Sequence, residues 1–142
     1  MMKTLAALTG TVALAAVAVS SAGAAAETPL QIAMKAGAAQ LTADQIAARI
    51  VGKTVTAAAG EKRFLFHYST DNVLTGKLIG GGWSDSGYYG ITDDDRVCLS
   101  MSKDKGRLRC LTLLEQNGAV KKYSTNGKMT FELLKFDDGK MF

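Results

Sequence analysis

The sequence predicts an all-β fold, an antiparallel up-and-down barrel or sandwich of seven to eight strands preceded by one short N-terminal helix. From residue 53 onward, short runs of β-branched, aromatic and aliphatic residues alternate with turn-forming segments. These segments are too short for the helical crossovers that join parallel strands. The chain has 142 residues, of which 47% are hydrophobic, with 15 Gly and one Pro. That composition suits one modest globular domain and excludes collagen-like and disordered chains.

Residues 1–26 have the pattern of a secretory signal peptide. A single basic residue precedes an apolar run over 5–19, and two overlapping small-x-small motifs follow it. They predict cleavage before Ala25 or before Glu27. The apolar run is shorter than the roughly 20 residues that span a bilayer as a helix, although an N-terminal anchor is the alternative. We therefore expect a mature protein in the periplasm or outside the cell, with no membrane span after cleavage.

Residues 27–40 are rich in alanine and glycine and show no clear period, so we expect a flexible leader there. The single β-rich domain, with its helix, then covers residues 41–142. The formal net charge of the whole chain is only +4. Nucleic-acid binding would need a dense basic stripe, so we expect no nucleic-acid partner. The expected partner is an unidentified periplasmic protein or a small ligand.

A short amphipathic helix is predicted at 43–51. Thr42 can cap its first turn while Gln45, three residues later, reaches back as the other half of a capping box. Ile46 and Ile50 lie four positions apart and therefore share the face that should pack on the domain.

Eight strand candidates follow the helix, and the breaks between them are chemically specific. Asn-Gly or Asp-Gly pairs occur at 117–118, 126–127 and 138–139, where left-handed backbone is favoured. The candidate strands are 53–58, 62–69, 73–79, 87–92, 96–102, 107–114, 119–124 and 128–136.

Cys98 and Cys110 are the two cysteines, and an oxidising compartment favours a disulfide between them. The strand pattern alone is compatible with either outcome, a disulfide or two separate cysteines. A four-residue turn would pair Ser102 with Arg107 and place Leu108 and Cys110 on the apolar face, with Cys98 on the opposite one. A shift of one residue, or a bulge, would bring both cysteines to the same face. We predict the disulfide because the compartment argument outweighs the pattern.

The best candidates for ligand contact follow the Gly80-Gly81-Gly82 run. Three glycines indicate a bulge or sharp bend rather than a phosphate-binding loop, because no helix or suitably placed lysine follows. Such a bend can expose rigid aromatic contact area. The candidate binding residues are Trp83, Ser86, Tyr88 and Tyr89, and the competing interpretation is that the aromatic ones belong to the core.

Catalytic and metal-binding signals are weak. His67 is the only histidine, and strand alternation places it opposite Phe64 and Phe66, on a polar face. Zinc or copper would need further ligands of a kind the chain does not supply, so we expect no metal and no cofactor. A serine-histidine-aspartate triad is possible on residue counts, but no nucleophile elbow supports it. Asp93-Asp94-Asp95 lacks the spacing of a calcium loop and is interpreted as a solvated turn.

Arg107 and Arg109 alternate on one predicted strand, and Lys121-Lys122 lie on the next. They could form a small cationic patch for an anionic partner. The interpretation we favour is that they are edge-strand cations that prevent aggregation.

Several short motifs resemble those of a group of small exported proteobacterial domains of unknown function, over about residues 41–140. The resemblance implies export, a β-rich domain and a cysteine pair, but no activity. Ser86-Gly87-Tyr88-Tyr89 also resembles the signature of small periplasmic lysozyme inhibitors, although its tyrosine falls one position early. The motifs of the first resemblance are Leu41-Thr42-Ala43-Asp44-Gln45-Ile46, Val51-Gly52-Lys53-Thr54-Val55, Tyr68-Ser69-Thr70-Asp71-Asn72, Gly87-Tyr88-Tyr89-Gly90-Ile91, Arg96-Val97-Cys98-Leu99 and Arg109-Cys110.

These observations favour an exported, non-catalytic binding or accessory module. The alternatives are an inhibitor of a cell-wall-degrading enzyme and a small hydrolase that uses His67 with a serine.

Overall fold

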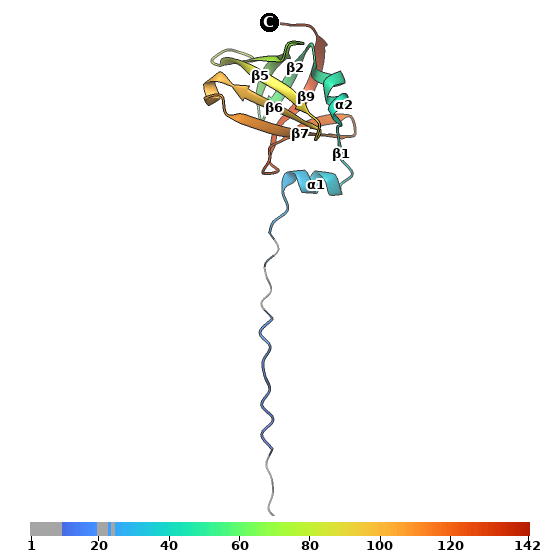
Figure 1. Ribbon diagram of the computed structural model, residues 1–142, viewed down its shortest axis with the longest axis vertical. Coiled ribbons are helices and arrows are strands. Elements are labelled where there is room, and N and C mark those ends of the chain that lie inside the picture. The colour runs from blue at the N-terminus through green and yellow to red at the C-terminus, as the bar shows by residue number, and fades with distance from the viewer. Residues whose placement is uncertain (1–9, 20–22, 24) are drawn as a thin grey trace, which may run out of the picture.

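The computed structural model describes residues 10–19, 23 and 25–142. The remaining positions of the predicted signal peptide, 1–9, 20–22 and 24, lie outside the described residues. Residues 10–19 form neither helix nor strand, and their side chains are exposed as the segment runs away from the folded body (Figure 1).

Eight antiparallel strands form a closed barrel, which confirms the predicted fold class. Each strand pairs with the next in sequence, and β9 returns to pair with β2. The barrel is therefore of the up-and-down kind rather than a sandwich. Its strands are β2 (Lys53–Ala59), β3 (Lys62–Tyr68), β4 (Val73–Leu78), β5 (Ser84–Thr92), β6 (Arg96–Met101), β7 (Leu108–Gln116), β8 (Ala119–Tyr123) and β9 (Met129–Asp138).

The segment expected to be a flexible leader contains regular structure instead. Helix α1 (Pro29–Lys35) begins at a capping box between Thr28 and Gln31. Strand β1 (Ala39–Gln40) then pairs with the end of β7, along the part of its edge that β6 does not reach. The alanine-rich composition obscured a local helix signal of the same kind as the one predicted at residue 42.

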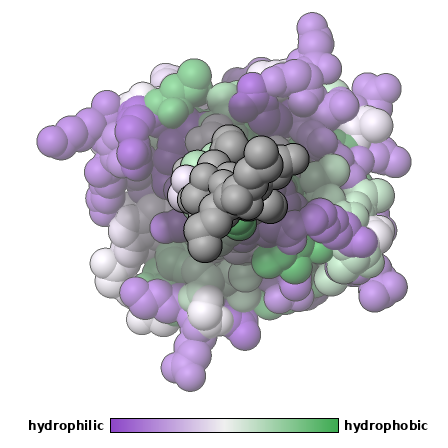
Figure 2. All heavy atoms as spheres, turned by 90° about the horizontal axis from the view of Figure 1, so that it is seen from below, coloured by the Kyte–Doolittle hydropathy of each residue, from purple (hydrophilic) through white to green (hydrophobic). Residues whose placement is uncertain are grey.

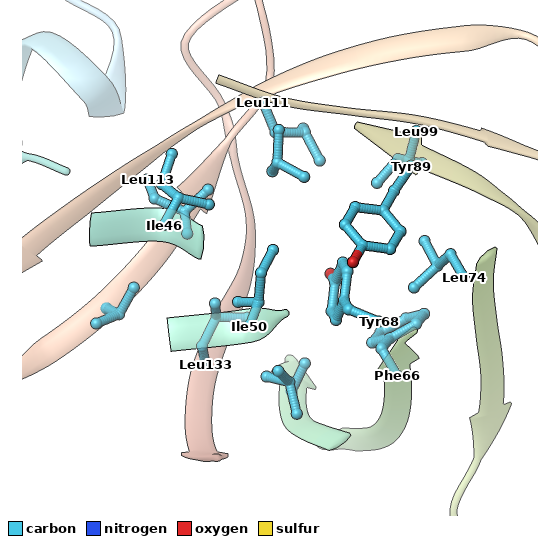
Figure 3. Close-up of a cluster of buried hydrophobic side chains, with 14 of the residues drawn as sticks. Ile46, Ile50, Phe66, Tyr68, Leu74, Tyr89, Leu99, Leu111, Leu113 and Leu133 are labelled. Atoms are coloured by element: carbon cyan, nitrogen blue, oxygen red, sulfur yellow. The ribbon is translucent and has the colours of Figure 1, made fainter. Parts of the chain in front are cut away.

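Helix α2 (Ala43–Ile50) confirms the predicted amphipathic helix. Thr42 and Gln45 form both halves of the capping box. Ile46 and Ile50 are fully buried, and Figure 3 shows them pointing toward Leu113 and Leu133 inside the barrel. The helix thus buries its apolar face against one end of the barrel.

The two ends of the barrel differ. In an up-and-down barrel, alternate turns lie at the same end. The turns 69–72, 93–95 and 117–118 lie with α2, whose first backbone N–H, that of Ala43, donates to Asp95 Oδ1 at 2.7 Å. The opposite end, which we call the hairpin end, has a short 3₁₀ helix, η1 (Ser102–Asp104), in one of its turns, and α1 reaches another turn through the hydrogen bond from the N–H of Leu30 to the carbonyl of Gly127. The hairpin end is formed by the turns 60–61, 79–83, 102–107 and 124–128.

The outer surface and the interior follow the alternation of each strand. Figure 2 shows mostly hydrophilic residues on the outer face seen from below, with smaller hydrophobic areas between them. The interior holds one main cluster of buried side chains, which includes Val55, Tyr68, Leu74, Tyr89 and Leu111. A second, smaller cluster lies outside the barrel under α1 and contains Ala38, Leu114 and Tyr123.

The disulfide between Cys98 and Cys110 is present, with an Sγ–Sγ distance of 2.06 Å. The two cysteines lie directly opposite each other in the β6–β7 ladder. This register differs by one residue from the one that a four-residue turn would give. The turn is longer because Lys105 adopts left-handed backbone with φ 56° and the N–H of Gly106 donates to the carbonyl of Met101.

The register also corrects the predicted apolar face of β7. Leu108 was expected inside but is 70% exposed, whereas Leu111 and Leu113 are buried in the interior. Cys98 and Cys110 therefore join the two strands on the outer face, while Leu99 and its neighbours in β6 face the interior as predicted.

Candidate functional site

The barrel encloses a cavity of about 230 Å³ toward the hairpin end. Seven of the eight barrel strands, or the turns between them, contribute to its walls; β2 does not. An eight-stranded barrel has an interior that side chains can just fill or that can hold one small ligand. Here the filling is incomplete, because α2 and its isoleucines occupy only the opposite end.

Aromatic rings line one side of this cavity. Phe64 makes edge-to-face contacts with Trp83 and Phe131, with ring centroids 5.6 and 5.5 Å apart. Phe66 meets Phe131 in the same way at 5.4 Å. Gly76 makes room for this wall, because a Cβ at that position would lie 2.8 Å from the Phe66 ring. The result is a rigid apolar surface, which can form because Gly76 has no side chain.

The glycine run before Trp83 forms the predicted bend. Gly80, Gly81 and Gly82 all have positive φ, of 96°, 90° and 94°, a conformation that other residues adopt only with strain. The N–H of Leu78 donates to the carbonyl of Trp83 across the bend at 2.8 Å. The bend therefore fixes the indole at the edge of the cavity, half-buried against the core.

Lys122 is the most unusual residue of the site, because it is only 2% exposed. Its Nζ donates a hydrogen bond to the hydroxyl of Tyr68 at 2.5 Å. The ammonium also lies 5.2 Å from the ring centroid of Tyr68, 5.7 Å from that of Phe66 and 6.0 Å from that of Phe131. Contacts of this length are favourable cation–π interactions. A lysine is almost never buried so completely without a charged partner.

The position of Lys122 corrects the sequence interpretation of Lys121-Lys122 as exposed cations. Val120 is buried in the core, and a strand places residues two apart on the same face. Lys122 therefore faces inward with Val120. This alternation is the signal in the sequence for the inward position, and it competes with the usual preference of lysine for the surface. Arg109 also lines the cavity, but its side chain is half-exposed and shares the carboxylate of Asp104 with Arg107, so the two arginines lie together at the mouth.

Charged side chains occupy the part of the cavity nearest the hairpin end. Asp85 accepts hydrogen bonds from the backbone N–H groups of Ser86 at 2.8 Å and Lys103 at 2.9 Å. Asp104 lies 3.2 Å from both the Arg107 and the Arg109 guanidinium groups. Both carboxylates thus already have partners at the mouth of the cavity.

The four candidate binding residues divide between the two faces of the barrel. Trp83 lines the cavity, and Tyr89 is 5% exposed within the core. Tyr88 is 69% exposed on the outside, where Ser86 is exposed as well. Strand β5 alternates between the faces, so these residues do not form one site. The core interpretation holds for Tyr89, whereas Trp83 retains a place at the candidate site.

The hydroxyl of Tyr89 donates to the carbonyl of Ser69 at 2.5 Å. Burial, with smaller contributions from Tyr68 and Asp71, raises the pKa of this hydroxyl above its ordinary value of 10.0. Tyr89 is thus held in its neutral form as part of the core.

His67 lies on the outward face of β3, opposite to Phe66 and Tyr68, as predicted. Its Nδ1 is 3.5 Å from Thr54 Oγ1, a hydroxyl that also donates to the carbonyl of Gly139 at 2.7 Å. The C-terminal segment after β9 therefore covers this region of the barrel wall.

The acidic turn at residues 93–95 has structural partners. Asp95 accepts the hydrogen bond from the start of α2. Hydrogen bonds from Thr92 and Arg96 hold the pKa of the Asp94 carboxyl below its usual range. Within the described part of the chain, no group of three or more histidine, cysteine or acidic side chains could hold a metal ion.

No protein-family model, curated protein or solved structure matches this chain. Across residues 10–19, 23 and 25–142, no helix has the length and apolar character needed to cross a membrane.

Proposed function

We propose that the protein is a non-catalytic binding module that works in the periplasm or outside the cell, and that it takes up a small ligand in the barrel interior. The cavity with its aromatic wall and buried Lys122 carries this proposal. Small-molecule sites are concave and mostly apolar, with a few polar groups that orient the ligand. The volume of about 230 Å³ favours a compact ligand rather than a long chain.

Two observations support the proposed location. Residues 1–26 have the order of a secretory signal, and the Cys98–Cys110 disulfide suits an oxidising compartment. Cell fractionation combined with intact-mass measurement tests this part. We expect a periplasmic or secreted protein that begins at Ala25 or Glu27. Recovery of the full-length chain from the cytoplasm with reduced cysteines would overturn it.

Trp83 provides the direct test of binding, because it is the only tryptophan of the chain and lines the cavity. Titration with phenylbutanol, a compact neutral amphiphile, should change its emission in a saturable manner. The variant Leu99→Phe adds volume to the cavity wall and should weaken this response. Tyr88→Ser, on the outer face of the barrel, is the matched control and should respond like the wild type.

A saturable change that Leu99→Phe leaves untouched would place the ligand outside the cavity and contradict the proposal. So would the absence of any response to neutral or charged phenylbutyl compounds.

A further inference from the structure

We propose that the ligand is a small organic anion, whose carboxylate pairs with Lys122 while its apolar body lies against the aromatic wall. This inference rests on the proposed function, since it names the chemical class that the same cavity would take.

The ammonium of Lys122 has three N–H donors. One reaches Tyr68, and the only other contacts described for the group are the faces of Phe66, Tyr68 and Phe131. Lys122 is a lining residue of the cavity. A buried ammonium is stabilised most by a charged acceptor that completes its hydrogen bonds. A ligand carboxylate in the cavity would be such an acceptor.

The described part of the chain does not supply this acceptor. Among the described residues, no carboxylate lies within salt-bridge distance of Lys122. The two acids that line the cavity, Asp85 and Asp104, already have partners at the mouth, namely two backbone N–H groups and two arginines. Lys122 is therefore the unneutralised charge of the interior.

The aromatic wall argues against a cationic ligand. Rings that surround a cation are a common recognition device for ammonium ligands. Here Lys122 itself occupies the faces of Phe66, Tyr68 and Phe131. A second cation in the same cavity would be repelled by the first. What the arrangement offers a ligand is the buried ammonium of Lys122 beside Phe64 and Trp83, with two further cations, Lys103 and Arg109, in the lining.

A series of three ligands that share one body tests the assignment. Phenylbutyrate, phenylbutanol and phenylbutylamine carry an anionic, a neutral and a cationic head, respectively. Calorimetric titration of the wild-type protein should give at least about tenfold tighter binding of phenylbutyrate than of phenylbutanol, because a charge-assisted hydrogen bond is added. Phenylbutylamine should bind more weakly than both.

The variant Lys122→Met keeps the length of the side chain and removes its charge. It should lose the preference for phenylbutyrate while it still binds phenylbutanol. Arg107→Met is the matched control, since it removes a cation from the exposed hairpin turn and should keep the preference. Because Lys122 has no carboxylate partner among the described residues, its replacement by methionine leaves no unpaired buried charge behind. If Lys122→Met does not fold, the three-ligand series on the wild type still decides the question.

The outcomes separate the two proposals. If phenylbutyrate and phenylbutanol bind the wild type equally well, or if Lys122→Met retains the preference, the anion assignment is overturned while binding in the cavity stands. If none of the three compounds binds the wild type, the proposed function fails together with this inference.

Discussion

The disulfide between β6 and β7 should account for a large part of the stability of this barrel. Cys98 and Cys110 are 12 positions apart, so the bridge closes a short loop in the unfolded chain. The chain-entropy relation for a loop of this size gives a stabilisation of about 3 kcal/mol. That is a substantial share of the roughly 5–15 kcal/mol typical of a small domain.

The perturbation is the double substitution Cys98→Ala and Cys110→Ala, measured by urea unfolding with circular dichroism. For a slope of about 1.5 kcal/mol per molar urea, the midpoint should fall by roughly 2 M. The urea midpoint of the wild-type protein should fall by a similar amount in reductant. The midpoint of the variant should not change when reductant is added. A loss below about 1 kcal/mol, or a variant that is sensitive to reductant, would refute this reasoning.

Three further predictions concern the barrel and its helix. Gly87→Ala should lower the free energy of unfolding by about 2 kcal/mol or more, because the added Cβ would lie 2.0 Å from the carbonyl oxygen of Ser100. Gly90→Ala, in the same strand, places its Cβ in open space, so thermal melts should show a change within about 0.5 kcal/mol. Above pH 10.0 the free energy of unfolding should fall, since Tyr89 ionises more readily in the unfolded chain. Tyr89→Phe should flatten that decline in urea titrations at several alkaline pH values, and an unchanged slope would contradict it. Thr42→Ala should cost about 1 kcal/mol in urea unfolding through the lost helix cap, and a change near zero would mean that α2 does not depend on this cap.

The strands of the barrel could be predicted because their ends are encoded locally. Asn117-Gly118, for example, adopts the left-handed backbone that such a pair favours, with φ of 52° and 80°. The register of β6 and β7 could not be predicted in the same way. It depends on Lys105, a residue whose side chain gives no hint that its backbone is left-handed and that the turn gains one residue.

The candidate site was predicted only in part. The glycine run pointed to Trp83, because three adjacent glycines indicate a bend at that place in the sequence itself. Alternation with Val120 indicates that Lys122 faces inward, but its hydrogen bond to Tyr68, which is 54 positions away in sequence, forms only when the barrel closes. Ser86 and Tyr88 were grouped with the site by proximity in sequence, whereas strand alternation directs them outward.

The central claim is that the interior of the barrel, rather than its outer face, binds the ligand. A titration with phenylbutanol, followed by the methyl NMR signals of leucine, tests it most directly. Leu74, Leu99 and Leu111 line the cavity, whereas Leu108 is exposed outside. The account predicts saturable shifts of the three interior leucines with an unchanged Leu108 signal. Shifts confined to Leu108, or no shift in any leucine, would contradict it.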